Sequence, residues 1–455
     1  MGQRFKPLQR NQSLLLPQSM REWLPEGDLA YFVIDLVDTL DLSEVYAFYD
    51  RAANGRGRKA ASGQPAYHPK MMTALLLYGY CMGTPSSRRI AKLCERDAGY
   101  RVVSADQQPN FRTISEFRRI HLAALIGLFV QVLLVAREAG LVKLGHVALD
   151  GTKVKANASK HKAMSYARMT EKERALAAEV AALLDQAEEV DAREDGLYGK
   201  DKRGDEVPEE LRFREGRLKK IREAKAALEA AAKEKARAEG KLDEDDKPKP
   251  PMCGPTPKTT PGTPRPKDQR NFTDPESKIM KMGDGSFDQA YNCQAAVDSE
   301  AQIIVARQAT DAGNDKQQLE PMTDQIEENL GEKPKRESAD SGYYSEGNVK
   351  YLRGKEIDDY VCPNRVKHGE NPPPVRGRIP KDLRFIDRVR RKLLTKKGRV
   401  TYGKRKEIVE PVFGQMKRVR GLRQFLLRGL IKVHGEWSLW CTTHNILKIW
   451  SAQAR

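Results

Sequence analysis

The sequence predicts an α/β protein: a mixed β-sheet with flanking helices, preceded by an all-α region and interrupted by a charged helical insertion. Short runs of alternating apolar residues occur around 146–154 and again across 291–361, and this pattern is typical of strands. Segments with apolar residues at helical spacing lie before and between these runs. A proline-rich basic segment, 247–267, separates the first strand from the later ones and cannot itself be packed secondary structure.

The composition indicates a large basic protein. The chain has 455 residues, with 81 Lys and Arg against 63 Asp and Glu and a net charge of +18. This balance favours nucleic acid as a partner, although a soluble basic protein without one would have the same composition. The six cysteines form no Cys-x-x-Cys pair, which argues against a zinc module or a disulfide framework. No apolar run reaches the length of a membrane span and the start lacks a signal-peptide core, so we expect a cytoplasmic protein without membrane contact.

Residues 1–140 are expected to form a helical N-terminal domain. A helix should begin near His68, where Pro69 suits the first turn, and a second should follow Ser86, which can cap it. Short helices joined by tight turns suit DNA binding when arginines line their surface. A bundle that only packs against the α/β domain is an equal alternative, because no recognition helix stands out. The arginines expected to be exposed are Arg88, Arg89, Arg112, Arg118 and Arg119.

The first strand carries an acid at its centre. Val147 and Leu149 alternate toward Asp150, and Gly151 follows directly. The glycine permits close backbone approach at that point. A carboxylate on a rigid strand, with two lysines just beyond it, suits a divalent metal near a phosphate. Taken alone, the stretch is more often an ordinary Asp-Gly turn.

The chain then leaves the sheet pattern. Residues 170–267 predict an antiparallel pair of charged helices with narrow apolar seams, followed by the proline-rich tether. A solvated charged spacer is the alternative. Of the remaining chain, 141–169 is expected to hold the first strand of the α/β domain, 268–429 the rest of that domain and 430–455 a C-terminal helix.

The later elements complete a recognisable order. A strand hairpin is expected over 291–306, then a helix capped by Asn314 or Asp315, a strand ending at Asp340, another helix and a strand near Asp359. Without the insertion, this is the mixed-sheet order of a ribonuclease-H-like domain. Acids would then lie on the first and fourth strands and on a late helix.

The late helix carries the third acid, Glu410. Three carboxylates from distant elements suit two hard cations, and two metals can serve in-line attack on a phosphodiester. Glu407, three residues earlier, is the alternative. Glu410 is favoured because Lys406 and Lys417 share its helix face at about 100° per residue. Pro411 is expected to kink this helix or to start it.

Basic residues surround this helix. Residues 381–423 hold 16 Lys and Arg against 4 Asp and Glu, a density that favours phosphate contacts. A solvated basic tail is the alternative, and the interleaved apolar side chains argue against it. The candidate DNA-binding arginines outside the helix face are Arg388, Arg390, Arg391, Arg418 and Arg420.

At these residues the chain resembles the DDE transposases of bacterial insertion sequences, over nearly its whole length. Leu-Asp-Gly-Thr at 149–152 is similar to the first acid motif of the family, and Ala-Asp-Ser-Gly-Tyr at 339–343 is similar to the second. Residues 67–119 are similar to the helical domain that precedes the catalytic domain in one such group.

The late helix resembles the tyrosine–arginine–glutamate–lysine signature of the family through Tyr402, Arg405, Glu410 and Lys417. Arg405 stands one residue further from Glu410 than in the common pattern, while Lys406 stands at the common distance. Either cation could therefore have the arginine role.

The resemblance implies metal-dependent cleavage at the ends of a mobile DNA element, followed by strand transfer into target DNA. Asp150, Asp340 and Glu410 would hold two Mg²⁺ or Mn²⁺ ions, and the remaining signature residues would grip phosphates near the cut. The partner would be double-stranded DNA, bound by a dimer in a bacterial cytoplasm at the nucleoid.

Two other functions remain open from the sequence. One is a nuclease of the same fold that cuts without joining, and the other is a non-catalytic DNA-binding relic. The three acids argue against the relic. Inverted repeats flanking the reading frame would favour a transposase over a nuclease.

Overall fold

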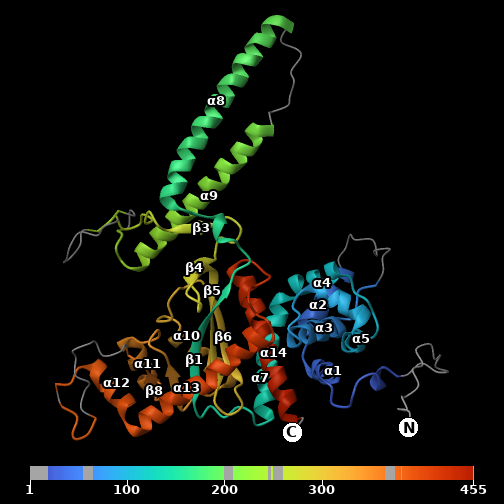
Figure 1. Ribbon diagram of the computed structural model, residues 1–455, viewed down its shortest axis with the longest axis vertical. Helices are drawn as coiled ribbons and strands as arrows, with labels where there is room; N and C mark the ends of the chain where they lie inside the picture. The colour runs from blue at the N-terminus through green and yellow to red at the C-terminus, as the bar shows by residue number, and fades with distance from the viewer. Residues whose placement is uncertain are drawn as a thin grey trace, which may run out of the picture.

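The computed structural model describes residues 19–54, 65–198, 209–243, 247–249, 260–363, 375–380 and 382–453. A β-sheet lies at the centre, the N-terminal helices lie to one side and a long helical hairpin projects away from both (Figure 1). A single continuous apolar core joins the N-terminal helices, the sheet and the C-terminal helix. The N-terminal region therefore packs as part of the main body.

The central sheet is mixed, with the strand order β4-β5-β1-β7-β8, and β6 pairs with β5. The neighbours β4, β5, β6 and β1 pair in antiparallel fashion, whereas β1, β7 and β8 run parallel. The strands are β1 (Val147–Lys155), β4 (Lys278–Lys281), β5 (Phe287–Asp298), β6 (Ile304–Thr310), β7 (Arg336–Ala339) and β8 (Asp358–Val361). The predicted mixed sheet with its hairpin and later strands is present, and β4 is an addition that the sequence pattern did not indicate.

The parallel pairing sets two acids at one level. Leu149 on β1 is the register partner of Ala339 on β7. Asp150 and Asp340 are the next residues of the two strands, so both leave the paired region at the same point. This level is fixed by the buried apolar residues on either side, since a register shift of one residue would turn those side chains to the other face.

Helices cover the sheet and link it to the N-terminal region. The C-terminal helix α14 contacts β6 as well as the N-terminal helices α3 and α7. Its buried Trp437 and Trp440 belong to the common core. The helices of the main body are α1 (Leu29–Thr39), α2 (Ser43–Asn54), α3 (Pro69–Cys81), α4 (Ser87–Arg96), α5 (Ala98–Val103), α6 (Phe111–Ile120), α7 (Leu122–Glu138), α10 (Leu319–Leu330), α11 (Glu346–Gly354), α12 (Phe385–Leu394), α13 (Lys396–Gly414) and α14 (Leu430–Gln453).

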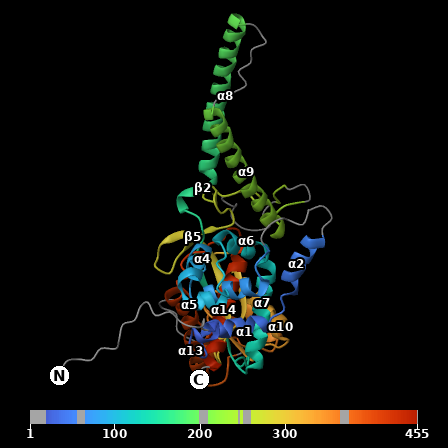
Figure 2. The same ribbon diagram turned by 90° about the vertical axis from the view of Figure 1, so that its right-hand side faces the viewer.

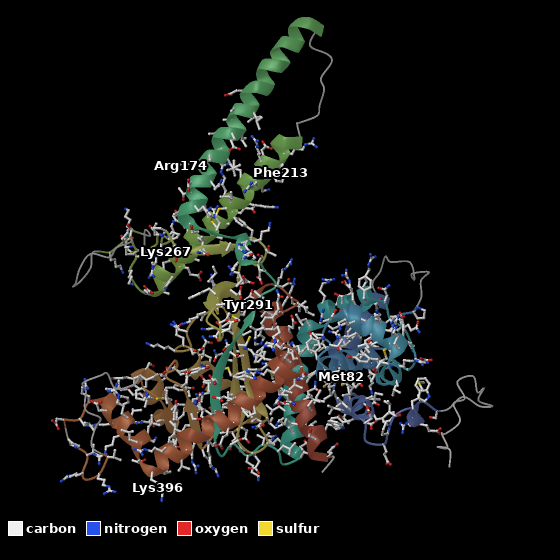
Figure 3. The ribbon with its side chains drawn as sticks, in the orientation of Figure 1. Met82, Arg174, Phe213, Lys267, Tyr291 and Lys396 are labelled. Atoms are coloured by element: carbon white, nitrogen blue, oxygen red, sulfur yellow. The ribbon has the colours of Figure 1, made fainter. Side chains whose placement is uncertain are left out.

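The insertion forms a helical hairpin from α8 (Tyr166–Tyr198) and α9 (Glu209–Ala238). Met169 and Leu176 on α8 pack against Leu218, Ile221 and Leu228 on α9 in an apolar cluster separate from the main core. Figure 2 shows the hairpin standing clear of the sheet and the N-terminal helices. In Figure 3, Arg174 and Phe213 lie on this hairpin, away from Tyr291 in the sheet.

A two-stranded sheet closes the base of the hairpin. β2 (Ala163–Ser165) pairs in antiparallel fashion with β3 (Gln269–Asn271). Among the described residues of 170–267, none joins the central sheet. An isolated bridge joins Leu242 to Pro248, and of these two residues only Pro248 belongs to the predicted tether.

Helix α13 crosses β8, β7, β1 and β5 and continues through Pro411. The proline has no N–H to donate to the carbonyl of Glu407, four residues earlier. The side chain of Gln302 donates to that carbonyl instead, at 2.8 Å. A π-helical turn, η3 (Gln415–Val419), follows the helix directly. The sequence predicted that the helix starts or kinks at Pro411. Instead, the helix runs through Pro411, and Gln302 supplies the hydrogen bond that the proline cannot make.

Among the described residues, no single helix is long and apolar enough to cross a membrane. The pair α6 and α7 would reach the required length and composition only together, and the two are bent by 73° relative to each other.

Candidate active site

Asp150 lies in the middle of β1, and its carboxylate is mostly shielded from solvent. Burial raises the pKa of Asp150 to about 6, and the nearby charge of Asp340 adds to this increase. The Arg405 guanidinium and the backbone N–H of Gly151 act in the opposite direction. The two acids that the sequence predicted on separate strands therefore interact electrostatically across β1 and β7.

Arg405 reaches the first acid from α13. Its Nη1 lies 3.0 Å from Oδ2 of Asp150, and both side chains are largely buried. Val409 and Val412, on the same face of the helix, are buried against the sheet. Lys406 is exposed, so Arg405 is the cation that the structure brings to Asp150.

Glu410 is exposed on the same helix. At about 100° per residue, it lies about 140° around the helix from Arg405. Glu407 is also exposed. Within the described part of the chain, no three Asp, Glu, His or Cys residues are gathered closely enough to hold a metal ion. The grouping of Glu410 with Asp150 and Asp340 therefore stays a prediction.

An acid that sequence reasoning assigned elsewhere lies beside this pair. Asp315 was expected to cap the following helix, but α10 begins only at Leu319, after Gln318. The Asp315 carboxylate instead accepts hydrogen bonds from Asn292 Nδ2 and Gln294 Nε2, both at 2.7 Å. Those two amides are buried polar side chains at alternating positions of β5. In the sequence, the sign of this arrangement was the pair of amide residues at alternating positions between apolar residues of this strand.

Two glycines leave room for these carboxylates. A Cβ on Gly151 would lie 2.7 Å from Gln294 Nε2 and 3.0 Å from Asp315 Oδ1. A Cβ on Gly342 would lie 2.9 Å from Asp340 Oδ1 and 3.1 Å from Asp315 Oδ2. The glycine of each acid motif therefore keeps a side chain out of the space that Asp315 and Asp340 border.

Two tyrosines frame the acids. Tyr343 is fully buried and its hydroxyl donates to Oε1 of Gln294. Burial raises the pKa of Tyr343, and the charges of Asp315, Asp150 and Asp340 raise it further. Tyr402, on α13, lies under the Arg405 guanidinium at 5.9 Å. Burial likewise raises the pKa of Tyr402. Both hydroxyls thus remain neutral hydrogen-bonding groups beside the carboxylates.

The basic residues predicted to contact DNA fall into two groups. Lys406, Arg418 and Arg388 are exposed. Lys417 is partly buried and donates to the backbone carbonyl of Lys153 at 2.8 Å, beside the end of β1.

Three other predicted contacts do not fit this structure. Arg420 is buried, donates to Thr443 Oγ1 at 2.9 Å and lies over the Trp440 ring at 5.2 Å. Arg391 is buried and donates to the backbone carbonyl of Gly377. Arg390 forms an ion pair with Asp387 at 3.0 Å, largely out of solvent. All three stabilise the fold, and their spacing in the sequence could not distinguish them from exposed cations.

Of the N-terminal arginines predicted to be exposed, Arg88, Arg89, Arg112 and Arg119 are exposed, and only Arg118 needs a correction. Arg118 was expected to be exposed, but it is buried and donates to Pro85 O at 2.9 Å and to Tyr80 Oη at 3.2 Å. Arg119 pairs with Glu116 on the helix surface. Arg88 and Arg112 both lie over the ring of Phe111, at 5.2 and 5.9 Å.

The residues at the site fit a divalent cation in chemistry. All candidate ligands are carboxylate or amide oxygens, which hard cations such as Mg²⁺ and Mn²⁺ prefer. Carboxylate oxygens of Asp340 and Asp315 are the two atoms nearest to the Cβ position of Gly342, at 2.9 and 3.1 Å. Mg²⁺ commonly uses only one or two protein carboxylates and retains water or phosphate oxygens for the rest. A three-carboxylate cage is therefore not required for binding.

Two family models match parts of the chain. A transposase DDE domain matches residues 255–446 and a transposase domain of otherwise undefined role matches residues 18–119. No curated protein and no solved structure matches the chain. Asp150 lies between the two matched segments, and the pairing of β1 with β7 brings it to Asp340 inside the matched DDE domain. The transposase domains matched in both halves of the chain support its identification as an insertion-sequence DDE transposase.

Proposed function

We propose that this transposase cuts DNA at the ends of its mobile element and joins the freed 3′ ends to target DNA. The observation that carries the proposal is the placement of Asp150 and Asp340 at one level of parallel strands, with Arg405 from α13 on Asp150. The mixed sheet with flanking helices supports a ribonuclease-H-like fold for the catalytic domain. We propose that this domain comprises 141–169 and 268–429, with the N-terminal helices and α14 packed on it and 170–267 inserted.

Asp150 and Asp340 would hold divalent cations, with Glu410 as the third carboxylate. Two bound cations would supply Lewis-acid activation of a nucleophile and neutralise charge at the phosphodiester. The carboxylate of Asp150 must then exchange its contact with Arg405 for the cation. A released Arg405 is positioned to bind a phosphate oxygen by its fork of N–H donors.

The chain would hold the DNA backbone around this centre. Lys406 and Arg418 offer exposed charge, and Lys417 lies at the end of β1. Burial lowers the pKa of Lys417, so an approaching phosphate would favour its charged form. Such contacts position the duplex without reading its sequence.

A cleavage and joining assay tests the proposal. The substrate is a labelled duplex with the sequence that flanks the reading frame, together with a supercoiled target plasmid and Mg²⁺. We expect cut ends and joined products with the wild-type protein, and neither product with Asp150→Asn or Asp340→Asn, while both variants still bind the duplex. We also expect Glu410→Gln to be inactive and Glu407→Gln to retain most activity.

Three outcomes would contradict parts of the proposal. Cutting without any joined product would indicate a nuclease. Full activity of Asp150→Asn would exclude that residue from the centre. An inactive Glu407→Gln beside an active Glu410→Gln would transfer the third position to Glu407.

A further inference from the structure

Asp315 is held in place more firmly than a loop acid requires. Its Oδ1 accepts hydrogen bonds from both Asn292 and Gln294 at 2.7 Å. Both amide side chains are buried on β5, the strand next to β1. Gln294 is itself held, because its Oε1 accepts from the buried Tyr343 hydroxyl. The orientation of the Asp315 carboxylate is therefore fixed by a chain of buried polar groups.

The second oxygen of Asp315 faces the site. Oδ2 lies 3.1 Å from the position that a Cβ of Gly342 would occupy, and Asp340 Oδ1 lies 2.9 Å from the same position. Among the described residues, Oδ2 accepts no hydrogen bond, whereas Oδ1 accepts two. The amides thus anchor one oxygen and leave the other directed at the space shared with Asp340.

A purely structural role would not need this arrangement. An acid that capped α10 would have to accept from the first backbone N–H groups of the helix, and Asp315 does not. Two ionised carboxylates whose oxygens both lie within about 3 Å of one point, as at Gly342, repel each other unless a cation lies between them.

We propose that Asp315 is a further carboxylate of the catalytic centre, which binds the same divalent cation as Asp340. This inference rests on the proposed function, since it requires that Asp150 and Asp340 form a metal centre. It assigns to β5, through Asn292 and Gln294, the task of orienting a ligand supplied by the loop before α10. Two carboxylates with water and phosphate oxygens complete a common Mg²⁺ ligand set.

Metal binding can be measured on the full chain without DNA cleavage. Calorimetric titration with Mn²⁺ is compared for the wild type, Asp315→Asn, Asp150→Asn and Asp311→Asn. Asp315→Asn keeps an oxygen that can accept from both amides, so the fold should persist, and thermal unfolding without metal checks this. Asp311 lies in the same loop, four residues earlier, where its carboxylate pairs with Lys278 at 3.9 Å, and it provides the matched control.

We expect Asp315→Asn to weaken Mn²⁺ affinity by about 10-fold or more, since even outer ligand partners contribute that much. Asp311→Asn should bind as the wild type does. In addition, Asp315→Cys should recover DNA cleavage when Cd²⁺, which accepts sulfur ligands, replaces Mg²⁺. Such metal-dependent recovery would not follow from a structural role.

The outcomes separate this inference from the proposed function. If Asp150→Asn loses affinity and Asp315→Asn binds Mn²⁺ normally, Asp315 is not a ligand and the proposed function stands. If the wild-type protein binds no Mn²⁺, the proposed metal centre fails and the inference fails with it. Equal loss in Asp311→Asn would indicate nonspecific electrostatic attraction and would also overturn the assignment.

Discussion

Arg405 and Asp150 form an ion pair of 3.0 Å that joins α13 to the centre of β1. The same contact blocks one oxygen of a proposed metal ligand, so binding of a cation and retention of this ion pair compete. The sequence left open whether Arg405 or Lys406 has the arginine role. The ion pair favours Arg405, because Lys406 is exposed.

Arg405→Ala should therefore reduce cleavage much more than Lys406→Ala. Loss of a positioned donor at the reacting phosphate costs on the order of 100-fold in rate, whereas an exposed cation contributes mainly to DNA affinity. Single-turnover cleavage at saturating protein measures the chemical step apart from binding. A larger defect in Lys406→Ala would assign the arginine role to Lys406.

Gly342→Ala should impair the site while leaving the protein folded. The added Cβ would lie 2.9 Å from Asp340 Oδ1 and 3.1 Å from Asp315 Oδ2, so both carboxylates must move. We expect at least about a 10-fold loss of cleavage, since misplacement of catalytic groups by an ångström is costly. Gly347→Ala is the control, because its Cβ would meet only Ser345 Oγ, at 3.7 Å. Similar activity of the two variants would argue against a tight space at Gly342.

Glu337 should make the protein less stable as the pH rises. It is fully buried on β7, where burial raises its pKa from 4.5 to about 8 and the Thr323 hydroxyl is its partner. The folded state holds the proton more tightly than the unfolded state, so this stabilisation is complete below pH 4.5 and is lost as the pH rises toward 8. The change is about 1.4 kcal/mol for each pH unit within that window.

Chemical denaturation of Glu337→Gln across this window tests the assignment. The variant keeps the shape and the hydrogen bond but cannot ionise, so its free energy of unfolding should depend less on pH than that of the wild type. Glu320→Gln, an exposed acid on α10, should leave the dependence unchanged. Parallel curves for Glu337→Gln and the wild type would show that Glu337 does not titrate in this window.

Arg418→Ala should mainly weaken DNA binding, whereas Arg420→Ala should mainly lower the stability of the protein. Arg418 is exposed, and loss of one phosphate contact should reduce the slope of log affinity against log salt by about 0.9. Arg420 is buried and bonded to Thr443 and Trp440, so its removal should cost about 2–4 kcal/mol of stability. Binding titrations at several salt concentrations, combined with thermal unfolding, separate the two effects. An unchanged salt slope in Arg418→Ala would place the phosphate contacts elsewhere.

The sequence was most informative where periodicity carried the signal. Alternating apolar residues predicted β1 and the β5–β6 hairpin, and the expected order of elements placed Asp150 and Asp340 on the first and fourth strands. The start of α3 at Pro69 followed from the fixed φ of proline at a first helical turn.

The remainder depended on tertiary contacts that no local pattern encodes. Asp315 could cap a helix by its local sequence, and only the two amides of β5 divert it to the site. Arg118 and Arg420 are buried because Tyr80 and Trp440, distant in the chain, provide partners for them. A charged residue beside apolar neighbours in the sequence can lie at the surface or in the core. Which of the two occurs depends on whether a residue elsewhere in the fold can pair with it.

The insertion between β1 and β5 has a consequence for how the chain folds. Val154 and Tyr291 are register partners, so the central pair of the sheet cannot form until a very long loop has closed. The β2–β3 pair joins the two ends of that loop at Ala163 and Asn271. Once the β2–β3 pair has formed, the length of the hairpin beyond it adds little to the free-energy cost of loop closure. Each doubling of the length of a flexible loop costs only about 0.6 kcal/mol. We therefore expect the hairpin to tolerate changes of length between homologous chains, with the pace of folding set by the meeting of β1 and β5.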